Sequence, residues 1–174
     1  MTRAGIAPRQ VDEVICSTAL GPGGNPARSI ALAAGLPEHV AGLSIDRQCA
    51  GGLDALALAR QMILSGAADI VVAGGAESYS RQPLRYRTFA DSRPPEAYTQ
   101  APFTPWPERD PDMTDAAAAL GRSQGISRQA QDEWAVESHA KARAHLPSET
   151  ELVPLAGSGS DTFTRRLSPA LCRR

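Results

Sequence analysis

The segment Ser44-Ile-Asp-Arg-Gln-Cys-Ala-Gly-Gly-Leu-Asp-Ala-Leu56 decides the fold of this chain. An apolar-leaning run from Ala41 leads through a short polar corner to Cys49, and a nearly unbroken apolar helix follows. A cysteine between a strand end and a helix start lies beside the unpaired N–H groups and the positive dipole end of that helix. That environment favours the thiolate, the reactive form of the side chain. The segment therefore predicts a sulfur nucleophile on an α/β scaffold.

The two glycines after the cysteine, Gly51 and Gly52, allow backbone to approach the sulfur closely, as an incoming acyl group requires. The backbone N–H of Cys49 is a candidate donor to a developing oxyanion. The alternative is that Cys49 is a small buried hydrophobe, because free cysteine is among the most buried residue types. The local pattern leaves both interpretations open.

Composition is that of an ordinary globular chain. With 174 residues, of which 42% are hydrophobic and 21% charged, the chain has the size of about one domain. Its net charge of −1 gives no general attraction to nucleic acid or to an anionic membrane. No uncharged apolar run approaches the ~18 residues of a membrane span. Cys16, Cys49 and Cys172 are too widely spaced for a disulfide framework or a metal site, so a reducing cytoplasm is the expected location.

Strands and helices are expected to alternate in the first part of the chain. The expected strands are Val11–Ser17, Ala41–Asp46 and Asp69–Gly74, and the expected helices are 26–34 and 51–65. Asn25 is a favourable cap with Pro26 at the first helical position. The helix at 51–65 is apolar on nearly all sides and is expected to be buried between layers. The pattern predicts an α/β layered core with a parallel-rich sheet.

The pattern changes after Ser78. Seven prolines between Pro83 and Pro111 exclude long helices and central strands from that stretch. Two helices are expected beyond it, at 114–124 and 127–146, the second capped by Ser127.

Three motifs resemble the N-terminal half of the thiolases, which are acyl-CoA C-acyltransferases such as acetyl-CoA acetyltransferase and 3-ketoacyl-CoA thiolase. They are Arg47-Gln-Cys-Ala-Gly-Gly-Leu53, the segment Leu64–Pro83 with Ala73-Gly-Gly-Ala-Glu-Ser78, and the segment Gly125–Ala142. They occur in the order of the family, and the resemblance runs from Ala4 to about Pro169. It implies a thiolase-like layered fold in three parts: a partial α/β core at 1–80, a loop domain at 81–155 that covers the active site and holds coenzyme A, and a return segment at 156–174.

The resemblance also implies a function. Cys49 would be the catalytic residue that an acyl-CoA acylates, in thiolysis or Claisen condensation of a 3-ketoacyl-CoA in fatty acid metabolism. Coenzyme A thioesters would be substrates, with no resident cofactor and no metal, and the protein would be a homo-oligomer. Met113 would line the acyl or pantetheine pocket; the alternative is that it fills the core.

Other parts of the family's machinery have no match here. The 174 residues contain no Gly-His-Pro, no Cys-Gly-Gly and no Asn-Glu-Ala-Phe motif. His39, His139 and His145 are expected to be structural or solvated, Cys16 to lie in the core, and Cys172 matches no catalytic motif. The isolated chain is therefore expected to be inactive as a thiolase, because residues that act as a catalytic unit lose most of their effect together.

Family members begin with a strand and a helix ahead of the segment matched by Ala4–Pro8. That strand lies centrally in their first sheet, so the chain is expected to be an interior piece of a thiolase, truncated at both ends, with an unpaired ladder in its sheet. Two alternatives remain: a non-catalytic fragment or pseudogene product, and a β-ketoacyl synthase relative. The motifs Glu77-Ser-Tyr-Ser80 and Gln131-Asp-Glu-Trp134 argue against the synthase.

Overall fold

The computed structural model describes residues 1–145, 148, 150–153 and 163–172. They belong to two compact units, Met1–Gln100 and Ala101–Arg174. The three-part division expected from the sequence remains a prediction, and residues 156–162 and 173–174 of its last part lie outside the described residues.

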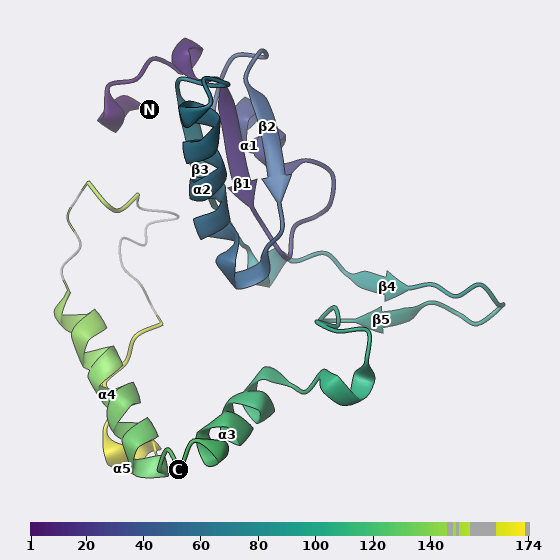
Figure 1. The fold of residues 1–174 in the computed structure, drawn as a ribbon, viewed down its shortest axis with the longest axis vertical. Helices are drawn as coiled ribbons and strands as arrows, with labels where there is room; N and C mark the ends of the chain where they lie inside the picture. Colours follow the sequence, from purple (N-terminus) through teal and green to yellow (C-terminus); the bar gives the residue numbers. More distant parts are fainter. Residues whose placement is uncertain (146–147, 149, 154–162, 173–174) are drawn as a thin grey trace. The chain divides into compact units, whose positions relative to one another are not determined.

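The first unit is built on a parallel sheet of three strands. These are β1 (Glu13–Ser17), β2 (Ala41–Ile45) and β3 (Val71–Gly75), in the order β2-β1-β3 (Figure 1). Each begins and ends within two residues of its predicted position. The α/β fold with a parallel sheet is confirmed.

The sequence predicted that a missing central strand would leave backbone ladders and apolar faces unpaired. The part about the centre of the sheet is wrong, because β1 pairs with both neighbours over its whole length. Glu13 lies opposite Ala41 of β2 and Val71 of β3, and Ser17 lies opposite Ile45 and Gly75. The pairing is possible because all three strands have five residues and the same direction, so β1 takes the central place itself.

Two helices cover opposite faces of this sheet, because successive side chains of β1 point to opposite sides. Val14 and Cys16 pack in one cluster with Ala27 and Ala31 of α1 (Pro26–Ala33). Ile15 packs in the other with small residues of α2 (Gly51–Leu64). Figure 1 shows the two helices on the two sides of the strands.

Helix α2 is buried on one face only, so the predicted burial on nearly all sides is wrong. Gly51, Ala55 and Ala59 are buried against the sheet. Leu53 and Leu64, in contrast, are 72% and 64% exposed. The four-residue spacing of the buried positions follows the helical period, so small residues set the contact with the sheet and the large ones point away. An apolar pattern all round a helix does not say which neighbours are present to cover it.

A small hairpin follows β3 in the proline-rich stretch. It pairs β4 (Arg85–Arg87) antiparallel with β5 (Glu96–Tyr98), apart from the parallel sheet. As predicted, that stretch has no long helix and no central strand. Short 3-10 turns complete the unit at Thr2–Ala4, Pro8–Gln10, Gln48–Ala50 and Tyr79–Arg81.

The second unit is helical in its described part. It contains a 3-10 turn at Pro107–Arg109, α3 (Met113–Ser123), α4 (Arg128–Ala144) and the short α5 (Pro169–Cys172). The predictions of 114–124 and 127–146 differ from α3 and α4 by one or two residues, and residue 146 lies outside the described residues. As predicted, Ser127 caps α4, its hydroxyl accepting from the Ala130 N–H at 3.1 Å.

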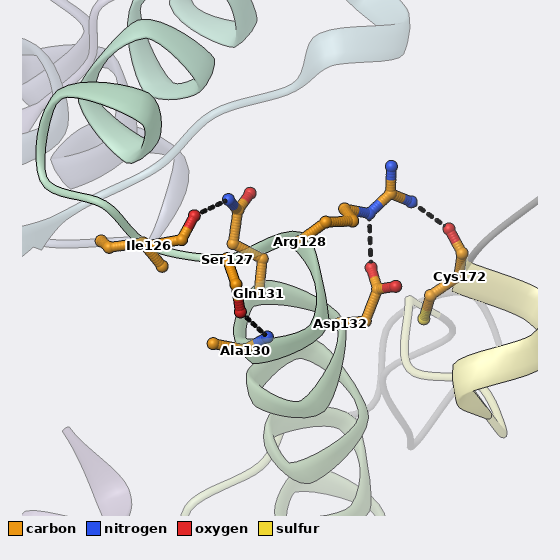
Figure 2. A network of polar contacts seen from close by, with 7 residues as sticks. All are labelled: Ile126, Ser127, Arg128, Ala130, Gln131, Asp132 and Cys172. Carbon is orange, nitrogen blue, oxygen red and sulfur yellow. Dashed lines mark hydrogen bonds and ion pairs between the residues drawn. The ribbon is translucent and has the colours of Figure 1, made fainter.

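Polar contacts fasten the start of α4 to its surroundings (Figure 2). Gln131 Nε2 donates to the Ile126 carbonyl at 3.1 Å. Arg128 pairs with the buried carboxylate of Asp132 at 2.7 Å and also donates to the Cys172 carbonyl of α5. Through its backbone carbonyl, Cys172 thus links α5 to the start of α4.

Candidate active site around Cys49

Cys49 lies where the sequence predicted, between the end of β2 and the start of α2. The connection is Asp46, Arg47 and a 3-10 turn, η3 (Gln48–Ala50), and α2 begins at the next residue. The thiol is free and the residue is exposed. The alternative of a small buried hydrophobe is therefore not what the structure shows.

The turn that carries Cys49 has a strained backbone. Gln48 has φ 47°, and among the described residues it is the one non-glycine residue with a positive φ. A side chain in this left-handed conformation costs about 1–2 kcal/mol. The Asp46 carboxylate offsets part of that cost, because its Oδ1 accepts from the Gln48 N–H at 2.7 Å. Strain of this kind clusters at functional sites and persists where the surroundings hold it.

Helix α2 continues directly from the turn that carries the thiol. The N-cap position is Ala50, which makes no side-chain cap hydrogen bond. The Ala50 N–H donates to the Arg47 carbonyl at 3.1 Å and the Gly51 N–H donates to the Gln48 carbonyl, so the turn supplies backbone acceptors to the start of the helix. The positive end of the helix dipole lies beside Cys49. The only acidic residue of the first turn is Asp54.

The two glycines after Cys49 have different roles. Gly51 is buried, and a Cβ there would come within 1.7 Å of Ser17 Oγ on β1. The absence of a side chain at Gly51 thus lets the start of α2 lie directly on the sheet. A Cβ at Gly52 would meet nothing within 4 Å. The predicted approach of an acyl group past these glycines stays a prediction.

An ion pair spans the turn. Arg47 Nε lies 2.9 Å from Asp54 Oδ2, so it joins a residue before Cys49 to the first turn of α2. Arg47 is 70% exposed and Asp54 is 31% exposed.

Hollows line the same edge of the sheet, where the carboxyl ends of the strands meet. One of about 360 Å³ lies between the segment after β1, helix α1 and the segment after β3, and its lining includes Thr18, Ile30 and Arg81. A smaller one of about 200 Å³ reaches Ser44 and Asp46, directly before the Cys49 turn. Open α/β sheets bind ligands at this edge.

Glu77 is a site residue whose contacts the sequence did not predict. Its carboxylate accepts from the backbone N–H groups of Ala19 and Leu20, 58 and 57 positions away. It thereby joins the segment after β1 to the segment after β3 at the rim of the larger hollow. The only local signal is its place two residues after a strand that ends in Gly74-Gly75.

The remaining predicted residues have these positions. Met113 is the first residue of α3, 60% exposed, and belongs to the second unit, whereas Cys49 belongs to the first.

Cys16 is buried as predicted, and burial raises the pKa of its thiol. His39 and His145 are exposed, and His139 Nδ1 accepts from the Arg165 N–H at 3.2 Å. The structural or solvated role expected for the histidines agrees with these surroundings.

The described residues are compatible with neither a metal cluster nor a membrane-spanning helix. They contain no group of three or more His, Cys, Asp or Glu side chains that could hold a metal ion. None of their helices combines the length and the apolar character needed to cross a membrane.

Comparison with known proteins gives consistent matches. Residues 1–166 match the family described as thiolase, N-terminal domain. The chain is 45% identical over 134 residues to "Putative acetyl-CoA C-acetyltransferase YhfS" of Bacillus subtilis, covering 77% of this chain and 33% of that protein. It is 35% identical over 156 residues to "Putative acetyl-CoA C-acetyltransferase VraB" of Staphylococcus aureus, covering 86% and 41%.

A solved structure agrees with these matches. The crystal structure of the Bacillus anthracis acetyl-CoA acetyltransferase superposes with a TM-score of 0.71 and 34% sequence identity, over 82% of this chain and 38% of that one. The chain thus spans well under half the length of the relatives it matches.

Proposed function

The chain belongs to the thiolase family, and we propose that it carries the acyl-accepting part of an acyl-CoA C-acyltransferase, with Cys49 as the nucleophile. The observation that supports this most is the position of Cys49: an exposed, free thiol on a strained turn directly before α2. The family match favours this reading over that of a β-ketoacyl synthase relative.

In the proposed step, the Cys49 thiolate attacks the thioester carbonyl of an acyl-CoA. A bond forms between Sγ and the acyl carbon, and the bond from that carbon to the coenzyme A sulfur breaks. Coenzyme A leaves as a thiolate and takes up the proton that Cys49 gave up. With a 3-ketoacyl-CoA, the thiolate attacks the 3-keto carbon instead, and the bond from that carbon to the α-carbon breaks. The α-carbon takes up the proton that Cys49 gave up, the shortened acyl-CoA leaves, and coenzyme A then accepts the acyl group from Cys49. In both cases coenzyme A is a substrate or product, so the proposal needs no resident cofactor.

The backbone N–H of Cys49 is the proposed donor to the oxyanion that forms during attack. Met113 is proposed to contact the acyl or pantetheine part of the substrate. The proposal also includes a homo-oligomer in the cytoplasm with no nucleic-acid or membrane partner. The net charge of −1 supports the absence of nucleic-acid and membrane partners, and the three free cysteines support a reducing compartment.

Intact-mass spectrometry after incubation with acetyl-CoA tests the proposal. We expect one acetyl adduct, mapped to Cys49 by peptide analysis and lost in Cys49→Ser. Cys172→Ser is the matched control, because Cys172 is also a free cysteine but its carbonyl holds Arg128 in the second unit. An adduct mapped to Cys172, or a folded sample with no adduct, would overturn the proposal in favour of a non-catalytic chain.

A second assay addresses turnover. With acetoacetyl-CoA and coenzyme A, we expect the 174-residue chain by itself to form the adduct without sustained thiolysis, because none of its residues matches the family's histidine and second cysteine motifs. Sustained thiolysis that disappears in Cys49→Ser would show that residues of this chain supply the acid and base.

A further inference from the structure

Three side-chain features surround the strained turn that presents Cys49, and the third of them is an ion pair. Before the thiol, the Asp46 carboxylate accepts from the Gln48 N–H. After it, Gly51 lies directly against Ser17 of β1. Across the turn, the Arg47 guanidinium meets the Asp54 carboxylate at 2.9 Å. Backbone hydrogen bonds from Ala50 to Arg47 and from Gly51 to Gln48 close the turn itself. The ion pair adds a side-chain contact between the residue before Gln48 and the first turn of α2.

We propose that the Arg47–Asp54 ion pair is a clasp that holds the Cys49 turn, so that Arg47 and Asp54 are positioning residues for the thiol. The inference matters for catalysis only if Cys49 is the nucleophile, and in that respect it rests on the proposed function. The clasp itself is a property of the turn, and the reactivity of the thiol reports on it without any acyl-CoA.

The reason for a clasp is the backbone of Gln48. A left-handed, non-glycine residue relaxes to an ordinary conformation unless the surrounding structure prevents it. Relaxation would change the direction in which the next residue, Cys49, projects from the start of α2. Arg47 directly precedes Gln48, and Asp54 lies on the rigid helix, so their contact limits this relaxation.

The charges of the pair provide a way to separate a positioning role from a field effect. A lone Asp54 would disfavour a thiolate nearby, and a lone Arg47 would favour it. A pure field effect therefore predicts opposite changes in thiol reactivity for Arg47→Met and Asp54→Asn. A clasp predicts the same change for both, because either substitution opens it. The clasp also predicts that the double variant is no slower than the single ones.

The experiment is a double-mutant cycle on the alkylation rate of Cys49. Full-length chains with Arg47→Met, Asp54→Asn or both react with iodoacetamide at one pH, and peptide mass spectrometry follows each cysteine separately. We expect each single variant to lower the Cys49 rate about two- to five-fold, the range of an exposed ion pair. Arg47→Lys keeps the charge and is expected to retain most of the rate. Cys172, in the other unit, is the internal reference.

A matched control uses a second exposed ion pair. Lys141 Nζ lies 2.6 Å from Glu137 Oε1 on α4, in the other unit. Glu137→Gln removes an interaction of the same kind without touching the turn, and is expected to leave the Cys49 rate unchanged.

Four outcomes would overturn the clasp: opposite changes in the two single variants, additive losses in the double variant, unchanged Cys49 rates, or an equal loss in Glu137→Gln. None of them bears on whether Cys49 accepts an acyl group, which the acetyl adduct decides separately. Conversely, the cycle can support the clasp even if no adduct forms.

Discussion

The two ends of the parallel sheet are built in opposite ways. At the amino end, Asp12 joins all three strands: its N–H donates to Ile70, its carbonyl accepts from Ala41, and its carboxylate accepts from the N–H groups of Asp69 and Ile70. At the carboxyl end lie a left-handed Gln48, an exposed Cys49 and two open hollows.

The difference indicates that the amino end of the sheet contributes mainly to stability and that the carboxyl end carries the reactive groups. The amino end satisfies its backbone groups with ordinary geometry and adjoins the buried side chains of Val11 and Val40. The carboxyl end retains strain and exposed reactive groups, because ligands reach an α/β sheet at that edge. Substitutions at the two ends should therefore separate stability from thiol reactivity.

The largest effect is expected where the carboxyl end meets the core. Gly51→Ala places a Cβ 1.7 Å from Ser17 Oγ, so α2 must shift away from β1. We expect a loss of about 1–3 kcal/mol in the free energy of unfolding, typical of overpacking. Urea unfolding followed by far-UV circular dichroism measures it. Tryptophan fluorescence would not, because Trp106 and Trp134 both lie in the second unit.

Gly52→Ala is the matched control for this substitution. It adds the same methyl group one residue later, where a Cβ meets nothing within 4 Å, and replaces glycine by a better helix former. It should stabilise the chain by up to about 1 kcal/mol. Equal losses in both variants would show that the contact with Ser17 is not the cause.

The next effect concerns the cap that joins α1 to β2. Asn25 Oδ1 accepts from the Arg28 N–H at 3.1 Å and from Ser44 Oγ at 2.7 Å. Its Nδ2 donates to the Gly42 carbonyl at 2.6 Å. We expect Asn25→Ala to cost about 1 kcal/mol of unfolding free energy, with Asn25→Asp, which keeps the cap but not the donor, in between. If Asn25→Asp loses as much unfolding free energy as Asn25→Ala, the whole effect comes from the hydrogen bond that Asn25 Nδ2 donates to Gly42.

Comparison of these two residues shows how far sequence reasoning reaches. Asn25 was predicted as a cap because capping is local: donor and acceptor lie three residues apart. The strands, the helices and the placement of Cys49 followed from equally local patterns. The contact of Gly51 with Ser17 and those of Glu77 with Ala19 and Leu20 were not predictable, because they join distant segments whose register only the fold sets.

Two errors have the same physical origin. The central place of β1 depends on which strands are present to pair, and the exposed face of α2 depends on which elements are present to cover it. Hydrophobic periodicity describes one element at a time and carries no information about its neighbours.

A smaller, pH-dependent effect is expected at the amino end. Hydrogen bonds from the backbone of Ile70 and Asp69 lower the pKa of Asp12 below its ordinary value of 3.8. The folded state therefore binds this proton less readily than the unfolded chain, so the contribution of Asp12 to stability is complete above that value. It is lost as the pH falls through the lowered pKa. Urea midpoints measured from about pH 5 downward should fall more steeply in the natural chain than in Asp12→Asn.

Asp91 supplies the control for that pH dependence. Arg93 lowers the pKa of its carboxyl through side-chain and backbone hydrogen bonds, but the two residues are neighbours in one loop. Asp91→Asn should change the pH slope of sheet unfolding less than Asp12→Asn does. A larger change for Asp91 would show that the contact with Asp69 and Ile70, directly before β3, is not what makes the amino end sensitive to acid.

The smallest effect on stability is expected at Gln48, where the contrast between the two ends is sharpest. Gln48→Gly relieves a strain of about 1–2 kcal/mol, but the more flexible unfolded chain offsets about 0.5–1 kcal/mol of it. The net gain should therefore lie between about 0 and 1.5 kcal/mol in urea unfolding. The alkylation rate of Cys49 should fall nevertheless, because a glycine is free to leave the left-handed conformation that directs the next residue. A variant that is both more stable and equally reactive would mean that the strain has no part in presenting the thiol, whereas stability gained with reactivity lost would show that the carboxyl end maintains the strain for its chemistry.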